Sequence, residues 1–211
     1  MKSSRRQGYT MVARAEGMVA TRDRIVQAAL ALALEQAYED ITLAAIAEAA
    51  DVSHQTVLNH FASKEKVAVA AAELLSRQTI DARARAMPGD LTGAISILVG
   101  EYERLGDANA RWAAAAERLG SLAAMLEGAR ASHQVWLEHI FSERLPTRHS
   151  ARRHAIHALH AATDVYTWKL LRRDLRLSRE TTERIMLDLA NGALDRISDR
   201  TPRRRSRRRK P

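Results

Sequence analysis

Apolar positions recur along the chain at helical spacing, and short polar breaks separate the helical stretches. After Thr21, apolar residues stand at positions 25, 28, 29, 32 and 33, which is the three- and four-residue spacing of one helix face. Thr21 is the predicted N-cap of this helix, which we expect to end near Gln36. Three further helical stretches begin after Thr42, Ser53 and Ser63, and each of these residues is a good helix cap. We predict two short helices ending near residues 50 and 60, and then a longer one.

Beyond Met87-Pro88-Gly89-Asp90 the same spacing extends over longer stretches. We predict helices at about 91–105, 109–127, 132–144, 149–173 and 179–197. The expected separators are Gly106-Asp107, a glycine at 128, Pro146 and Leu177-Ser178.

Composition favours the same all-α fold. Apolar residues make up 46% of the chain and aromatics only 4%, with 9 glycines and 4 prolines, so turn-rich β folds are disfavoured. There is no cysteine, which excludes disulfides and thiol chemistry and fits a reducing compartment. No apolar run approaches the ~20 residues of a membrane span, and the basic N-terminus lacks the apolar core of a signal peptide. We therefore expect a cytoplasmic protein that makes no membrane contact.

The net charge of +9 is unevenly distributed. Residues 1–20 carry +3 and residues 201–211 carry +7, which leaves −1 for residues 21–200. Two basic ends therefore flank a nearly neutral body. Such ends are typical of contact with a polyanion, although they also serve as solubilising tails.

The stretch AEAADVSHQTVLNHFASKEKV, residues 47–67, has the pattern of a helix-turn-helix, in which two short helices meet at a three- or four-residue turn. At 100° per residue, Val57 and Phe61 fall on one side of the second short helix. Gln55, Thr56 and Asn59 fall on the other side. Amides and a hydroxyl can bond to base edges and phosphates without burying a charge. This face is the candidate DNA reader; the alternative is an ordinary solvated face.

The residues TRDRIVQAALALALEQAYEDITLAAIAEAADVSHQTVLNHFASKEKV resemble the DNA-binding domain of TetR-type transcriptional repressors. The resemblance covers residues 21 to about 73. It implies an all-α protein with a three-helix helix-turn-helix domain at 21–73 and a larger helical ligand-binding and dimerisation domain at 74–200. The remaining segments are a basic N-terminal arm at 1–20 and a basic disordered tail at 201–211.

Two positions depart from the family pattern. Asp51 stands where the family usually has glycine in a left-handed turn, a conformation that Asp tolerates better than most residues. Leu58 stands where the family usually has Tyr or Phe, and it lacks the tyrosine hydroxyl that holds a phosphate. We therefore expect the turn to survive and one backbone contact to be lost.

The resemblance also assigns roles to individual side chains. Thr56 and Lys64 would hold phosphates, and Gln55, Asn59 and His60 would face bases or the backbone. The full predicted DNA-binding set is Arg22, Thr42, Ser53, His54, Gln55, Thr56, Asn59, His60 and Lys64.

A single helix-turn-helix touches few base pairs, so a specific operator needs two copies about one helical turn (~34–36 Å) apart. We therefore expect a homodimer on a palindromic double-stranded operator. The predicted dimer stripe consists of Ile156, Leu159, Val165, Leu170, Ile185 and Leu189. Its alternative is an intramolecular core.

The middle helices are the predicted sensor of an unidentified small-molecule effector. The candidate pocket residues are Arg111, Trp112, Met125, His133, Trp136, Phe141 and Tyr166, most of them large residues in an alanine-rich background. Each of them also suits ordinary core packing.

The chain shows no catalytic or cofactor-binding motif of the HExxH, GxSxG or Walker type, so we expect neither an enzyme nor a cofactor. His154, His157 and His160 recur every three residues, but this spacing drifts around a helix, so we expect surface or interface roles rather than metal. The rival to a ligand-responsive repressor is a sequence-nonspecific nucleic-acid-binding protein driven by the basic ends. A helical enzyme with a vestigial helix-turn-helix is a third interpretation.

The charge distribution predicts that the N-terminal arm supplies cations to the DNA contact, because residues 21–72 carry −3 on their own. Deletion of residues 1–18 should weaken operator binding and flatten the dependence of log affinity on log salt, since fewer counterions are released. Titrations at several salt concentrations measure both effects. An unchanged salt slope would contradict the prediction.

Overall fold

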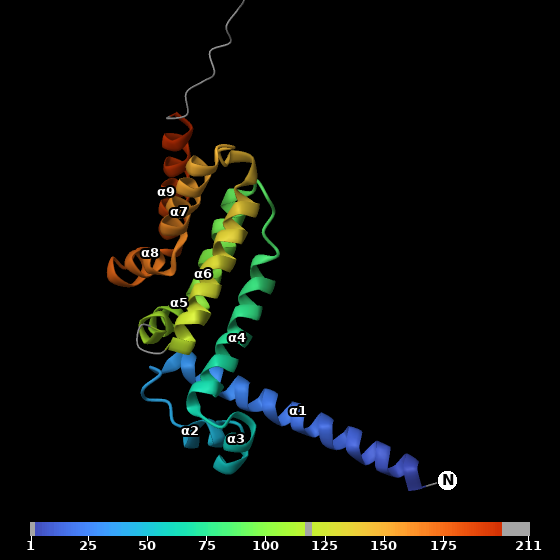
Figure 1. Cartoon of the computed structure of the whole chain (residues 1–211). Helices are drawn as coiled ribbons and strands as arrows, with labels where there is room; N and C mark the ends of the chain where they lie inside the picture. Colours follow the sequence, from blue (N-terminus) through green and yellow to red (C-terminus); the bar gives the residue numbers. More distant parts are fainter. Residues whose placement is uncertain (1–2, 117–119, 200–211) are drawn as a thin grey trace, which may run out of the picture. The chain divides into compact units, whose positions relative to one another are not determined.

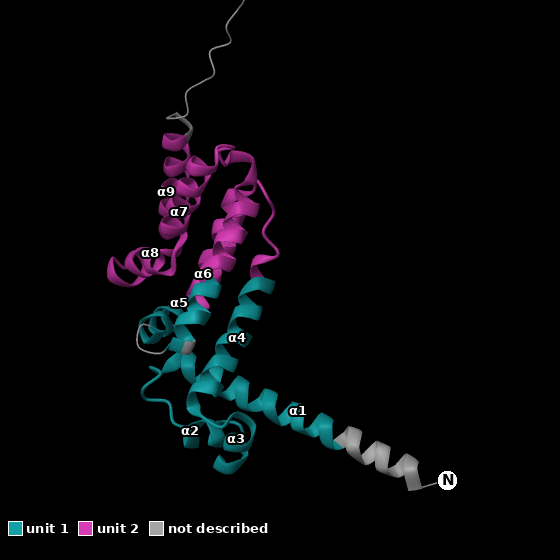
Figure 2. Cartoon of the chain, viewed as in Figure 1, with its two compact units in different colours: residues 1–81, 107–129 teal, residues 82–106, 130–211 magenta. Residues whose placement is uncertain are grey.

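The computed structural model describes residues 3–116 and 120–199, and every regular element in these ranges is helical (Figure 1), which confirms the all-α prediction. The chain forms two compact units (Figure 2). The first comprises residues 1–81 and 107–129, and the second comprises 82–106 and 130–211. The predicted tail at 201–211 lies outside the described residues.

The first unit contains the predicted helix-turn-helix. Its helices are α1 (Ser3–Glu35), α2 (Leu43–Ala49), α3 (His54–Phe61) and the greater part of α4 (Lys64–Arg83). The predicted caps of α2 and α3 are confirmed: Thr42 accepts from the Ala45 amide, and Ser53 accepts from the Thr56 amide, both at 3.1 Å. The core between these helices is made of Ile25, Ala29, Ile46, Val57 and Phe61, all buried.

Helix α1 begins 18 residues before its predicted N-cap, so that prediction was wrong. Thr21 lies inside the helix, and the predicted arm is helical from residue 3. The reason is that residues 3–20 contain no proline and several good helix formers, so a helix already formed at Ile25 extends backwards at little cost.

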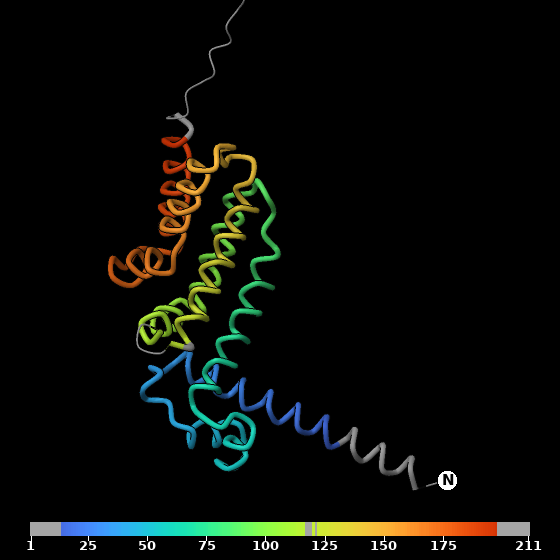
Figure 3. The backbone as a smooth tube through the Cα atoms, viewed as in Figure 1, coloured from blue at the N-terminus to red at the C-terminus, as the bar shows by residue number. Residues whose placement is uncertain are grey.

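The later helices are α5 (Leu91–Ala116), α6 (Gly120–Ile140), α7 (His149–Thr163), α8 (Val165–Lys169) and α9 (Arg179–Asp199), with a 3-10 turn η1 (Ser142–Arg144) and a π-helical turn η2 (Leu170–Asp174). Figure 3 follows the same path as a tube. The predicted end of α4 before 87–90 is confirmed. The predicted helix at 149–173 is instead broken at Asp164, whose backbone is extended and whose carboxylate accepts from the Tyr166 amide at 2.8 Å to start α8.

The division into units also differs from the predicted domain limits. Residue 73, the predicted end of the helix-turn-helix domain, lies within α4. Residues 107–129, predicted to belong to the larger domain, group with the first unit. There Ala115, Ala116 and Leu122 pack with Ala68 of α4.

Gly106 does not separate two helices as predicted, because it lies within α5. A Cβ atom added at Gly106 would overlap the indole ring of Trp168, lying 2.7 Å from its Cε3 and Cη2 atoms, and this tryptophan is fully buried. Trp168 also packs 5.9 Å from the Tyr102 ring and donates from Nε1 to Glu103 at 3.1 Å. The indole ring can therefore pack at this place because residue 106 has no side chain.

A buried polar network in the second unit joins residues of four helices, α4, α5, α6 and α7. Arg83 at the end of α4 forms two hydrogen bonds with Glu101, at 2.7 and 3.1 Å, and donates to Nδ1 of His133 at 2.8 Å. Because arginine is only a donor, Nδ1 of His133 must accept, and Nε2 then carries the proton and donates to Thr163 at 2.9 Å. The Thr163 hydroxyl in turn donates a hydrogen bond to the Leu159 carbonyl at 2.8 Å. The network therefore requires His133 to be neutral.

The electrostatic surroundings of His133 agree with this requirement. Burial lowers its pKa well below the usual value of 6.5, and the positive charge of Arg83 and the neighbouring His160 lower it further. Asp164 acts in the opposite direction but does not reverse the shift.

The packing of Gly106 predicts the effect of adding one methyl group. Gly106→Ala should lower the free energy of unfolding by about 1–3 kcal/mol, because the Trp168 ring must move. Gly128→Ala is the matched control, since Gly128 lies within α6 and an added Cβ there would meet no atom within 4 Å. It should instead stabilise by up to about 1 kcal/mol through helix propensity. Denaturant unfolding measures both, and equal behaviour of the two variants would contradict the packing account.

The neutral His133 predicts a stability that falls with acid. Its pKa is depressed in the folded protein, so the unfolded chain binds more protons below about pH 6.5, and stability is lost as the pH falls towards the folded pKa. The slope contributed by one such group is at most about 1.4 kcal/mol per pH unit. His133→Gln should reduce this slope, measured by denaturant unfolding at a series of pH values, whatever its effect on stability at pH 8. The control is His139→Gln on the exposed face of α6, which removes a histidine outside the buried network.

Candidate nucleic-acid interface

The turn before α3 has the conformation expected from the sequence. Asp51 has a φ of 52°, so the predicted left-handed residue is confirmed. The turn is closed by the Asp51 amide, which donates to the Glu48 carbonyl at 3.1 Å, and by the Val52 amide, which donates to the Ala47 carbonyl at 3.0 Å. Asp51 thus adopts the left-handed conformation that glycine usually adopts at this position in the family pattern.

Both ends of α3 are capped. Ser53 accepts from the Thr56 amide, and the hydroxyl oxygens of Ser53 and Thr56 are 2.8 Å apart. At the other end Ala62 has a φ of 60°, and its amide donates to the Leu58 carbonyl at 2.8 Å. Sequence reasoning missed this second left-handed residue, because alanine gives no local signal for it.

The two faces of α3 are divided as predicted except at Thr56, which is half-buried. Val57 and Phe61 are buried, whereas His54, Gln55 and Asn59 are exposed. The Gln55 side-chain amide donates to the Asn59 side-chain oxygen at 3.0 Å across one helical turn. The exposed face is therefore polar, carries no Asp, Glu, Lys or Arg, and is ordered by its own hydrogen bond.

Three other predicted DNA-binding residues lie around this helix. The Arg22 guanidinium lies 4.6 Å from the centre of the Phe61 ring, and its side chain is exposed. The His60 ring is half-buried, 6.4 Å from the same Phe61 ring. Thr42 is exposed but uses its side-chain oxygen to cap α2. Their roles towards DNA stay predictions.

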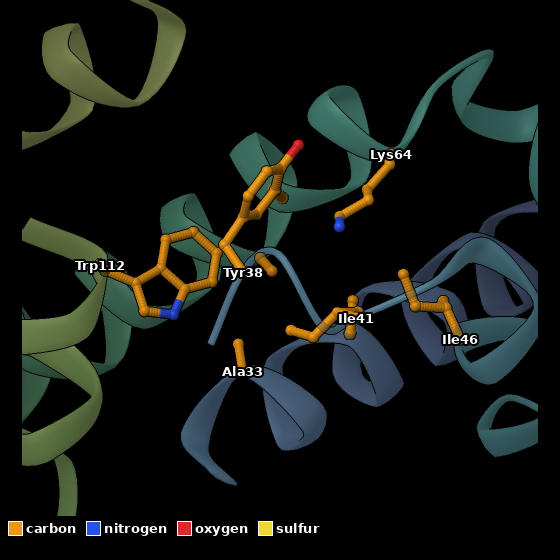
Figure 4. Close-up of a pocket in the computed structure, with 9 residues that line it drawn as sticks. Ala33, Tyr38, Ile41, Ile46, Lys64 and Trp112 are labelled. Atoms are coloured by element: carbon orange, nitrogen blue, oxygen red, sulfur yellow. The ribbon is translucent and has the colours of Figure 1, made fainter. Parts of the chain in front are cut away.

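Lys64, the first residue of α4, already has internal partners. Its ammonium lies 4.3 Å from the centre of the Tyr38 ring and donates to the Glu39 carbonyl at 3.3 Å. Figure 4 shows this lysine beside a small, mainly apolar cavity that is also lined by Ile41, Ile46 and Trp112. Lys64 therefore ties the α1–α2 connection to the start of α4, and its predicted phosphate contact stays a prediction.

The predicted pocket residues are divided between the two units. In the first unit, Trp112 lines the cavity beside Lys64, Arg111 donates to the Leu34 carbonyl near the end of α1, and Met125 is half-buried. In the second unit, Phe141 is a buried core residue and Tyr166 is 48% exposed. His133 and Trp136 stack with ring centres 5.8 Å apart, next to Arg83.

The predicted dimer stripe needs a correction. Ile156 and Leu159 are buried in the core of the second unit, so they have no surface to offer a partner chain. Val165 and Ile185 are half-buried and pack on a neighbouring core cluster. Leu170 and Leu189 remain exposed, at 50% and 48%. The apolar spacing of these helices therefore reflects mainly intramolecular packing.

The histidines of α7 do not form a metal site with their neighbours. Residues 3–116 and 120–199 contain no group of three histidines or carboxylates arranged to hold a metal ion. His160 instead lies 3.4 Å from the Asp164 carboxylate. Over the same ranges, no helix has the length and apolar character needed to cross a membrane.

Comparison with known proteins gives a match over the helix-turn-helix. Residues 25–71 match the family model described as bacterial regulatory proteins, tetR family. The HTH-type transcriptional regulator TcmR of Streptomyces glaucescens is 51% identical over 49 residues, which are 23% of this chain and 22% of that protein. The chain therefore matches about a fifth of this relative's length.

Solved structures resemble the chain over most of its length. A transcriptional regulator from Rhodococcus sp. Rha1 has a TM-score of 0.70 at 18% identity, over 82% of this chain and 96% of that one. A tetR-family transcriptional regulator from Streptomyces coelicolor has a TM-score of 0.66 at 16% identity, over 85% and 89%. At these identities the likeness concerns the fold.

The capped α3 with its left-handed turn, the matching family model and the shared fold lead to one conclusion. The helix-turn-helix at residues 25–71 resembles that of the tetR family of bacterial regulatory proteins, and most of the chain shares the fold of solved transcriptional regulators.

Proposed function

We propose that this protein is a ligand-responsive repressor that binds a palindromic operator as a homodimer. The observation that carries the proposal is the exposed face of α3, where Gln55 and Asn59 present amide groups to solvent while Val57 and Phe61 anchor the helix. Amides on a rigid helix suit base edges in the major groove, which is wide enough to admit an α-helix.

The charge distribution supports different roles for the exposed face of α3, which would contact bases, and the N-terminal arm, which would supply positive charge. Residues 21–72 carry −3, so they cannot attract DNA through net charge. Residues 1–20 carry +3, and α1 runs continuously from Ser3 into the helix-turn-helix domain. The arm therefore continues the same helix that supplies Ile25 to the core, and its charge is tied to α3 by a stiff connection.

Dimerisation supports the palindromic operator. Leu170 and Leu189 are large apolar side chains that the monomer leaves about half exposed. Burial of such side chains against a second copy is worth roughly 1–2 kcal/mol each. A two-fold dimer would repeat α3 with the symmetry of the DNA half-sites.

Ligand response would act on α4. This helix begins at Lys64, directly after α3 and its Ala62 cap, and ends at Arg83 in the buried network. An effector that favours a conformation with a different arrangement of Glu101 or His133 would alter how the end of α4 is held. The predicted pocket residues His133 and Trp136 lie beside this arginine and are the first candidates for effector contacts.

The rival, sequence-nonspecific binding driven by the basic ends, is an outcome of the same test. Selection of bound sequences from a random DNA pool should recover a palindrome, and sedimentation should show a dimer on it. Recovery of no motif, together with loss of binding on truncation at Thr201, would favour the nonspecific protein instead.

Two substitutions should separate base reading from general affinity. Asn59→Ala should weaken operator binding more than random-DNA binding, because only the operator offers a matching base edge. Lys64→Ala should weaken both alike, whether the lysine touches phosphate or holds the Tyr38 connection in place. Competition titrations with operator and random duplexes measure the ratio. Equal losses for Asn59→Ala on both DNAs would rule out its base-reading role.

A further inference from the structure

The side chains of Gln55 and Asn59 form one joined surface on α3. They are four residues apart, so they lie on the same helix face, and the Gln55 Nε2 donates to the Asn59 Oδ1 at 3.0 Å. Both side chains are exposed, and within the described residues this bond is their only side-chain hydrogen bond. The helix beneath them is fixed at both ends by Ser53 and Ala62.

The bond determines which groups the pair can offer outwards. It uses one proton of the Gln55 amide and accepts on the Asn59 oxygen. The Gln55 oxygen and the Asn59 NH₂ group remain wholly available, and Gln55 Nε2 and Asn59 Oδ1 each keep one further bonding position. Reversing both amides exchanges the roles of the two residues. In either orientation the pair can present an amide oxygen of one residue beside an NH₂ group of the other.

Among the bases, adenine matches this pair in the major groove. Its edge offers the N7 acceptor beside the N6 amino donor, whereas guanine offers two acceptors, N7 and O6. Against guanine, the amide oxygen would face a second acceptor with no proton between them. Cytosine and thymine each offer a single hydrogen-bonding group at that edge.

We propose that Gln55 and Asn59 act as one unit that reads an adenine, and hence an A·T pair, at one position of each operator half-site. This inference rests on the proposed function, because it requires sequence-specific binding through α3. The alternative is that each amide reads a separate base. Joint reading uses the hydrogen bond between Gln55 and Asn59 to fix both side chains before they meet the base, which lowers the entropy cost of binding.

The first test compares selected sequences. Wild type, Gln55→Ala and Asn59→Ala are each used to select from a random DNA pool, with Gln78→Ala as the control. Gln78 is an exposed glutamine on α4 in the same unit, so its loss removes an amide away from α3. Both α3 variants should lose the preference for adenine at the same single position of the half-site, and the control should keep it. Loss at two different positions, or a guanine preference there in the wild type, would overturn the proposal.

The second test removes single atoms from the DNA. Replacing that adenine by 7-deazaadenine removes the N7 acceptor, and replacing it by purine removes the N6 amino group. Each change should weaken wild-type binding about tenfold, the order expected for a bidentate base contact. Neither should weaken binding further in the Asn59→Ala variant. Full wild-type affinity for either modified operator would overturn joint reading.

The outcomes also separate this inference from the proposed function. Failure to recover any palindrome would contradict the proposed function, sequence-specific binding by a dimer. A palindrome bound by a dimer would support that function. If Gln55→Ala and Asn59→Ala then affected different positions of it, only the joint adenine contact would be contradicted.

Discussion

The position of α3 depends on the backbone of the turn that precedes it. Asp51 adopts a left-handed φ of 52°, and this reverses the chain so that Ser53 can cap α3 within two residues. The cap fixes the first turn of α3, and the buried Val57 and Phe61 then fix its rotation. Because rotation about the helix axis determines which side chains face outwards, the exposure of Gln55 and Asn59 follows from that turn.

Helix α3 is flanked by two residues that adopt the left-handed conformation although neither is glycine. They are Asp51 before the helix and Ala62 after it. Asp can bond locally in this region, but alanine gains nothing there and costs roughly 1 kcal/mol relative to glycine. The cost is offset by Phe61, which is buried directly before Ala62 and holds the end of the helix.

The features predicted from the sequence were those with local causes. The caps at Thr42 and Ser53, the left-handed Asp51 and the two faces of α3 each depend on residues within one or two helical turns. Two of the errors have long-range causes. Gly106 lies within α5 and leaves room for Trp168, 62 positions later. Ile156 and Leu159 pack inwards on a core that helical spacing cannot distinguish from an interface.

At the candidate site, too, the features that were predictable from the sequence were those with local causes. Which side chains of α3 face outwards followed from its spacing, but the hydrogen bond between Gln55 and Asn59 needs their rotamers and was not predictable. The sensor residues were the least predictable, since large side chains suit a core as well as a cavity. Phe141 and His133 illustrate the two outcomes, one in apolar packing and one in a polar network.

In the proposed ligand-responsive repressor, the two ends of α4 are where ligand response and DNA reading would constrain one another. At its first residue, Lys64 is held by the Tyr38 ring and the Glu39 carbonyl, and at its last, Arg83 is held by Glu101 and His133. The first set of contacts is exposed or half-buried and weak, whereas the second is buried and involves a charged pair. Breaking a buried pair costs far more than breaking a surface contact. An effector of the proposed repressor would therefore need either to replace the partners of Arg83 or to leave them in place and act through the weaker contacts of Lys64.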